Sequence, residues 1–496
     1  MTNKRAVEET LSIQSWLRPA LTEVRANKDY EMFRDQIMAV DALLGKAHLE
    51  AMAIDFAMEG MKGASTAQRC TRAEFTVKAL RIQTLRMMLG NPAYRVFSRM
   101  VAGSDLLADF CRVRKIDGIS GISKSTVERA SKFFRSDQVR WMHQVLIEMS
   151  GEEDRAREIG LVRAIETGEV LIDGMCLEAN IHYPVDWVLL RDVSTTLLKA
   201  TKLVRKGGLC QRMPEEPEGF ARQMNLLCIE MTHTRRKSDG RKARKAVLRK
   251  MKPLLKTIAG HAQRHRDLLE ADWASTHYSQ VQARQIIERM DRMLEQVPAV
   301  IKQAHERLIG ERSVPSDEKI LSVHQPDINV LVRGKAGREV EFGNTLVLTE
   351  STQGLILDWE LYQKAAPAEW RQLQESLERQ NQFDLTTPIE AVSADRGFST
   401  KQGSHALAQQ AIYNAVCPRN PNELKNRLGD KRFARLQRRR GSTEGRIAIF
   451  KQRQGRRLRE GSFAHRYLAV AWSVLGHNLW MIARMLTDQK QIAEAA

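Results

Sequence analysis

Two short apolar runs, each followed at once by an aspartate, lie far apart in this chain. Asp173 follows the run VLI at 170–172, and Asp395 follows the run AVSA at 391–394. Runs of this length and composition predict buried β-strands, so each aspartate is expected at the end of a short strand. A chain that pairs these two strands must form a sheet that is interrupted by a long insertion.

The segments around these aspartates alternate between strand and helix signals, as in a mixed α/β layer. A helix that Asp186 can cap is expected to run to about residue 204. Strands are predicted at 170–177, 338–348, 355–361, 389–394 and 415–418, and further helices at 367–380 and 405–413.

The first 150 residues are predicted to be almost wholly helical, because apolar residues recur there at the helical period. Small residues at 121–127 precede a helix that extends to about residue 134. That helix is either the second helix of a helix-turn-helix unit or an ordinary capped helix in an all-α domain.

The expected domain organisation follows from these signals. An all-α domain at 1–150 precedes a split α/β core at 165–206 and 331–460, with a basic helical insertion at 207–330. An apolar C-terminal helix within 461–496 is expected to pack on the core. With 43% apolar residues among 496, the chain can bury cores for two or three domains.

The net charge predicts a polyanionic partner. The formal charge is +19, and the excess of arginine and lysine is spread over several segments. Residues 235–250 hold nine lysines or arginines and one acid, Asp239. Such a helix can lie along a phosphate backbone, although a charge run is more often a solvated face. RNA, DNA and an acidic membrane surface each fit the charge.

Export, a membrane span and a histidine metal site are not expected. The six cysteines form no Cys-x-x-Cys pair, which indicates reduced, mostly buried thiols in a cytosolic protein. The N-terminus has no apolar signal-peptide core, and His477, Asn478 and Arg484 interrupt the most apolar stretch. His261 and His265 are four residues apart, but no third ligand accompanies them.

A third acid stands in a basic, helix-forming stretch near the end of the chain. Arg440, Glu444 and Lys451 are separated by four and seven residues, which puts all three on one face of an α-helix. Glu444 is either a surface ion-pair partner or the helix-borne member of an acid site. In the second case, Asp173 and Asp395 would supply the two strand-borne members.

Three such carboxylates suit phosphodiester chemistry. Mg²⁺ prefers hard oxygen ligands and keeps several waters, so a few carboxylates are enough to hold it. Two ions about 4 Å apart activate the nucleophile, stabilise the leaving group and neutralise the phosphate. The expected cofactor is therefore a pair of Mg²⁺ ions at Asp173, Asp395 and Glu444, with Mn²⁺ as a substitute.

Four blocks, in order along the chain, resemble the DDE transposases of bacterial insertion sequences. DGMCLEANIHYPVD at 173–186 resembles the first-aspartate block of that family, and ADRGF at 394–398 is similar to the second. RGK at 333–335 and VEFG at 340–343 resemble the approach to the second strand. Arg440, Glu444 and Lys451 match the R-x₃-E-x₆-K signature, in which Gln437 replaces the usual tyrosine.

The resemblance implies a ribonuclease-H-like core and a function. The implied activity is metal-dependent cleavage at the ends of a mobile element, followed by attack of the freed 3′-hydroxyl on target DNA. The implied partners are double-stranded DNA and further copies of the chain, which would form a dimer or a larger assembly. The implied location is the nucleoid in a bacterial cytoplasm. Residues 1–150 are expected to bind DNA or to mediate dimerisation. The DNA-binding residues expected are Arg440, Lys451, Arg333, Lys335, Arg396, Arg241, Lys242 and Lys245.

Two alternative functions remain open. One is a structure-selective DNA nuclease with the same acids, and the other is a non-catalytic DNA-binding protein derived from a transposase. Four other acids lie on or near the expected strands and compete for the site: Glu178, Asp186, Glu341 and Asp358. Asp186 is better explained as a helix cap, and Glu178 is expected on the strand face opposite to Asp173.

Overall fold

The chain folds into two compact units, each with its own core. The computed structural model describes residues 28–115, 118–119, 121–234, 239–316, 318–335, 338–385, 387–454 and 461–495. One unit combines the chain up to Glu178 with the chain from Asn344 onward, and the other is Ala179–Gly343. The expectation of a mixed α/β protein with a large helical insertion is therefore confirmed at this level.

The first unit is built around a mixed sheet, whose strands are neighbours in the order β5-β3-β7-β8, with β6 on the outer side of β5. β5 and β6 are antiparallel, whereas β3, β7 and β8 run parallel to one another. The strand bounds are β3 Glu169–Glu178, β5 Arg338–Ser351, β6 Ile356–Leu361, β7 Ala391–Ser393 and β8 Tyr413–Asn414.

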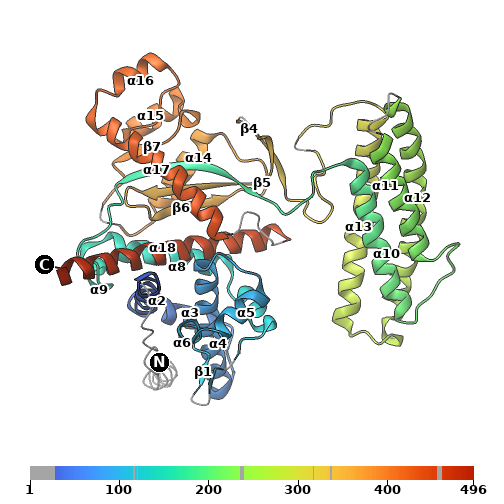
Figure 1. The fold of residues 1–496 in the computed structure, drawn as a ribbon, viewed down its shortest axis with the longest axis horizontal. Coiled ribbons are helices and arrows are strands. Elements are labelled where there is room, and N and C mark those ends of the chain that lie inside the picture. Colours follow the sequence, from blue (N-terminus) through green and yellow to red (C-terminus); the bar gives the residue numbers. More distant parts are fainter. Residues whose placement is uncertain are drawn as a thin grey trace. The chain divides into compact units, whose positions relative to one another are not determined.

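Helices from the C-terminal part pack against this sheet. α17 (Lys431–Gln454) contacts β3 and β7, and α14 (Glu369–Gln380) contacts β6. α18 (Phe463–Ala495) packs on β6, where the side-chain amide of Asn478 bonds both the N–H (2.9 Å) and the C=O (2.8 Å) of Ile356. Figure 1 shows α17 lying across the strands toward α18. The predicted packing of the C-terminal helix on the core is confirmed.

The N-terminal helices join the same unit through α18, which contacts α2, α4 and α8 (Figure 1). As predicted, this part is mainly helical, and Ser123 caps α7 by accepting the N–H of Thr126 at 3.1 Å. The elements are α2 Lys28–Lys46, α3 Leu49–Met58, α4 Thr66–Met88, α5 Tyr94–Ala102, α6 Asp105–Phe110, β1 Arg114–Lys115, β2 Gly118–Ile119, α7 Lys124–Ser131, α8 Ser136–Gly151 and α9 Glu153–Glu158.

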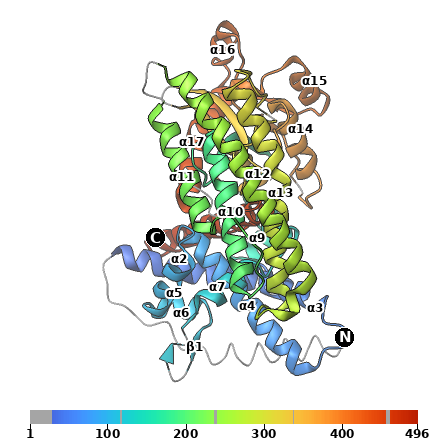
Figure 2. The same ribbon diagram turned by 90° about the vertical axis from the view of Figure 1, so that its right-hand side faces the viewer.

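The second unit is a bundle of four helices with a short hairpin. Figure 2 shows the four helices side by side, and each packs on at least two of the others. β4 pairs antiparallel with the first half of β5. The bounds are α10 Asp186–Lys206, α11 Pro217–Thr234, α12 Gly240–Asp272, η1 Trp273–Ser275, α13 Gln280–Leu308 and β4 Asn329–Lys335.

The bundle corrects the expected boundary of the insertion. α10 was expected in the α/β core, but its apolar side chains Leu190, Val193 and Leu197 are buried in the core of the bundle. The inserted unit therefore begins at Ala179 rather than near residue 207. Periodicity predicts that a helix such as α10 has an apolar face, but it does not identify the partner that covers this face.

Two local predictions near the sheet are also corrected. The helix expected at 405–413 is α15 (Lys401–Gln409), which starts at Thr400, a cap that accepts the Gly403 N–H at 2.9 Å. The strand expected at 415–418 is β8, which pairs earlier, at Tyr413 with Ala391. A short helix, α16 (Pro421–Arg427), follows it.

Among the described helices, none has the length and apolarity that a bilayer crossing requires.

Candidate active site

Asp173 and Gly174 lie in the middle of β3 and are half-buried, between two runs of buried residues. Val170, Leu171 and Ile172 before it are buried, and so are Met175 and the two residues after it. Asp173 was expected at the end of its strand, but β3 continues to Glu178 because this second apolar run also packs in the core. The Asp173 Oδ1 accepts the N–H of Gly174 at 2.7 Å.

Asp395 follows β7, as predicted, two residues past the end of that strand. β3 and β7 are parallel, and the last pair of their register is Leu171 opposite Ser393. If this register continued for two more residues, Asp173 would be level with Asp395, with the spacing of about 4.8 Å that neighbouring strands have. The Asp395 Oδ1 accepts the N–H of Gly397 at 2.8 Å and thereby caps the short helix η2 (Arg396–Phe398). The two predicted aspartates thus belong to neighbouring parallel segments of one sheet.

Gln437 attaches α17 to the strand ends beside Asp395. Its Nε2 donates to the backbone oxygens of Ala415 at 2.6 Å and Ala394 at 3.3 Å, and it lies 3.2 Å from the Ser393 hydroxyl. Its Oε1 lies 3.4 Å from the Nε of Arg440. Gln437 stands where the transposase signature has tyrosine, and in this fold its amide supplies two donors that a phenol could not both replace.

Replacing Gln437 with leucine is expected to lower the free energy of unfolding by about 1–3 kcal/mol, because two backbone oxygens lose their side-chain donor. Chemical denaturation followed by tryptophan fluorescence measures this change. Arg438, one position along and exposed, provides the control: Arg438→Gln should change stability by less than about 0.5 kcal/mol. Equal stability of the leucine variant and the wild type would contradict the anchoring role.

Glu444 lies on α17, two helical turns after Gln437 and on the same side of the helix by the 3.6-residue period. Its neighbour Thr443 is buried and donates a hydrogen bond of 2.5 Å to Glu350 of β5, so this part of α17 also lies against the sheet. The side chain of Glu444 lies outside the described residues. The helix that carries position 444 is thus in contact with the strands that carry both aspartates.

The sequence reading missed a fourth carboxylate, Glu369, in the first turn of α14. A Cβ added at Gly397 would lie 1.8 Å from the Glu369 Oε2 and 3.0 Å from the Asp395 Oδ1, so these oxygens are at most 4.8 Å apart, the sum of those two distances. A side chain at position 397 would therefore displace the Glu369 carboxylate from its place beside Asp395. An acid at a helix start is a common stabilising feature, so nothing local marked Glu369 as part of a site.

The predicted DNA-binding cations have different surroundings. Arg396 is exposed beside Asp395, and Arg440 is half-buried on α17. In the inserted unit, Lys245 and Arg241 pair with Glu311 at 2.8 and 3.5 Å, and Lys242 is exposed. Three further predicted cations have side chains outside the described residues: Lys451, Arg333 and Lys335.

Two of the competing acids have structural partners. Asp358 is 2% exposed and pairs with Arg379 at 2.7 Å and Arg140 at 3.1 Å. Asp186 is buried and pairs with Arg307 at 2.8 Å. Asp186 was expected to cap α10, but Val185 occupies the cap position and no side chain caps this helix. Glu178 and Glu341 also take part in interactions within the structure.

The described side chains contain no group of three or more histidine, cysteine or acidic residues that could hold a metal ion. Glu444 is not among them, so the predicted set of three acids is only partly visible. Asp173 and Asp395 supply hard carboxylate oxygens, and this donor chemistry suits Mg²⁺. Comparisons of the chain with protein-family models, curated proteins and solved structures found no match.

Proposed function

We propose that this chain is a DNA transposase of the insertion-sequence type, which cleaves the ends of its element and joins the freed 3′-hydroxyl to target DNA. The observation that supports the proposal is the parallel pairing of β3 and β7, whose register, continued for two residues, would place Asp173 level with Asp395. The two aspartates are 222 residues apart, and each follows an apolar run that predicts a strand. An unrelated pair of strand acids would rarely share one level of a sheet.

The arrangement of α17 supports the third position of the site. In a ribonuclease-H-like core, neighbouring strands and a crossing helix bring three carboxylates together. Here α17 contacts both β3 and β7, and Gln437 fixes it next to Asp395. We therefore assign Asp173, Asp395 and Glu444 as the catalytic acids of such a core, with Glu369 beside them.

The acids fit the chemistry that Mg²⁺ supplies. When bound, the ions lower the pKa of the attacking water or hydroxyl and offset the charge that develops on the phosphate. Asp173 and Asp395 would hold them, and each aspartate already uses Oδ1 to accept a backbone N–H. These two hydrogen bonds fix the carboxylate orientations before any ligand is present, which is the preorganisation that metal binding requires.

The inserted bundle supplies a second basic surface. On α12, Lys242 and Arg249 are seven residues apart and exposed, so they lie on one face, and Lys250 adjoins them. No acid occurs in α12 before Asp267. A long helix with exposed cations on one face fits a phosphate backbone, so we propose that α12 binds DNA outside the active site.

Changing Lys242, Arg249 and Lys250 together to glutamine is expected to weaken DNA binding and to flatten its salt dependence. Each lost phosphate contact lowers the slope of log K against log salt by about 0.9, so the slope should fall by up to about 2.7. Fluorescence anisotropy with a labelled duplex at four salt concentrations measures it.

The matched control changes the exposed residues Arg284, Arg289 and Arg292 of α13 to glutamine. This variant loses the same charge from the same bundle, but its arginines alternate with Glu288, Asp291 and Glu295. Its slope should stay near the wild-type value. If both triple variants lowered the slope equally, α12 would contribute only general charge.

The function itself is tested by incubating the protein with Mg²⁺, a supercoiled plasmid and a labelled DNA fragment that carries the sequence flanking its own gene. A transposase yields nicked ends and labelled strands joined to the plasmid. Cleavage without joining would point to the nuclease, and binding with no metal-dependent product would point to a non-catalytic DNA-binding protein.

A further inference from the structure

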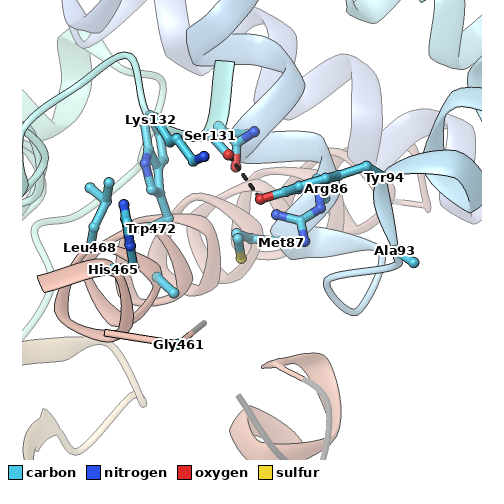
Figure 3. Close-up of a pocket in the computed structure, with 12 residues that line it drawn as sticks. Arg86, Met87, Ala93, Tyr94, Ser131, Lys132, Gly461, His465, Leu468 and Trp472 are labelled. Carbon is cyan, nitrogen blue, oxygen red and sulfur yellow. Dashed lines mark hydrogen bonds between the residues drawn. The ribbon is translucent and has the colours of Figure 1, made fainter. Parts of the chain in front are cut away.

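A cavity of about 340 Å³ lies among α4, α5, α7 and α18 (Figure 3). Its volume is near the lower end of the range of about 300–1,000 Å³ that is usual for small-molecule sites. Among the residues that the structure describes, twelve line it and none of them is acidic: Gln83, Arg86, Met87, Ala93, Tyr94, Ser131, Lys132, Gly461, His465, Leu468, Ala469 and Trp472.

One side of the cavity presents positive charge. Arg86 is only 3% exposed, donates from Nε to the Pro92 oxygen at 2.9 Å, and stacks 4.6 Å from the centre of the Tyr94 ring. These contacts hold a buried cation in a fixed position. Figure 3 shows the Arg86 guanidinium, the Tyr94 hydroxyl and the Lys132 ammonium pointing toward the same space. Lys132 also pairs with Glu128 at 3.1 Å, at the surface.

Other lining groups supply further donors. The N-cap residue of α5 is Ala93, which offers no side-chain acceptor to the first amides of that helix. The Gln83 Nε2 and Trp472 Nε1 belong to lining residues that are each 1% exposed, and neither atom has an acceptor among the described residues. Helix amides, a fixed arginine and a lysine together favour an anion. A phosphate is favoured because its oxygens can accept from several donors at once.

Apolar side chains also line the cavity, next to the charged ones (Figure 3). Met87, Leu468, Ala469 and Trp472 line it, and all four are buried. A bare inorganic ion would leave this surface uncovered. We propose that the cavity binds a small organic phosphate of mononucleotide size, with the phosphate at Arg86 and Lys132 and the organic body against the apolar lining residues. The phosphate group can come from a free nucleotide or from a nucleotide of a nucleic acid.

Equilibrium dialysis of the full chain with radiolabelled adenosine monophosphate tests this proposal. The nucleotide should bind, and inorganic phosphate should compete with it. Adenosine, which lacks the phosphate, should not bind. Lys132→Met should weaken binding about tenfold, since one charge-assisted contact is lost. Lys132 is exposed, so this change should leave the fold intact, which thermal melting verifies.

Lys124→Met is the matched control. Lys124 pairs with the same Glu128 at 2.8 Å, and both lysine side chains are 52% exposed, but Lys124 does not line the cavity. Its replacement should leave nucleotide affinity unchanged. Equal weakening by both lysine variants would overturn the proposal, and so would the absence of nucleotide binding or equal binding of adenosine.

A final arm of the experiment identifies the source of the phosphate. One possible result is that a DNA duplex displaces the nucleotide, and that Lys132→Met weakens duplex binding while Lys124→Met does not. This result supports the cavity as a site for part of a polynucleotide. A duplex that binds without displacing the nucleotide supports a free small molecule as the ligand. Because DNA cleavage is not measured, failure here leaves the proposed transposase function intact.

Discussion

Replacing Asp395 with asparagine is expected to lower the rate of metal-dependent DNA cleavage by roughly 10³-fold, while DNA affinity changes little. The amide is a poor ligand for Mg²⁺ and lacks the charge that offsets the metal. The fold should tolerate the change, because the amide oxygen of asparagine can still accept the Gly397 N–H that Asp395 accepts at 2.8 Å. Single-turnover cleavage of a labelled DNA end and anisotropy of the same DNA measure the two effects.

Glu390→Gln is the matched control for this prediction. Glu390 directly precedes β7, at the end of the strand opposite to Asp395, and its half-exposed side chain pairs with Arg432 at 3.5 Å. The control removes one acid from the same segment and should keep a cleavage rate near that of the wild type. If Asp395→Asn cleaved as fast as the control, Asp395 would not belong to the catalytic site.

Replacing Asp358 with asparagine is expected to lower the free energy of unfolding by about 3 kcal/mol, because it breaks a buried ion pair. The Asp358 carboxylate accepts from Arg140, Arg379 and the Ser376 hydroxyl. Burial alone would lower the pKa of Arg379, but the hydrogen bonds and charge of Asp358 raise that pKa above its usual range. Without the carboxylate, two guanidinium groups remain largely buried with less compensating charge.

Urea denaturation followed by tryptophan fluorescence measures this loss of unfolding free energy. Glu378→Gln, on the exposed side of α14, is the control, and its unfolding free energy should change by less than about 0.5 kcal/mol. The stability result separates structural acids from catalytic ones. Asp358→Asn should unfold more easily than Asp395→Asn. The reverse order would mean that the assignment of these two acids is wrong.

The strands were predictable where a buried apolar run was long enough to be recognised. The prediction of a strand at 170–177 is confirmed by β3, and the one at 355–361 by β6. β4 was missed, because its segment NVLVRGK contains glycine and charged residues and has little apolar alternation. This hairpin strand pairs at the edge with β5, and edge strands need less apolar sequence than central ones.

The site was only partly predictable, because sequence patterns report periodicity and not long-range contacts. Asp173 and Asp395 stood out since each follows an apolar run. Glu369 did not, because an acid in the first turn of an amphipathic helix has a local explanation. The role of Gln437 was hidden for the same reason: its partners Ala394 and Ala415 lie on strands that only the fold brings to α17.

Joining of a labelled element end to a plasmid, measured for the wild type, Glu444→Gln and Glu369→Gln, tests the central claim that Asp173, Asp395 and Glu444 form one metal-dependent site. The account predicts joined products from the wild type only with Mg²⁺ or Mn²⁺, none from Glu444→Gln, and a reduced amount from Glu369→Gln. Joining by Glu444→Gln at the wild-type rate would contradict the account, and its loss in Glu369→Gln alone would make Glu369 the third acid.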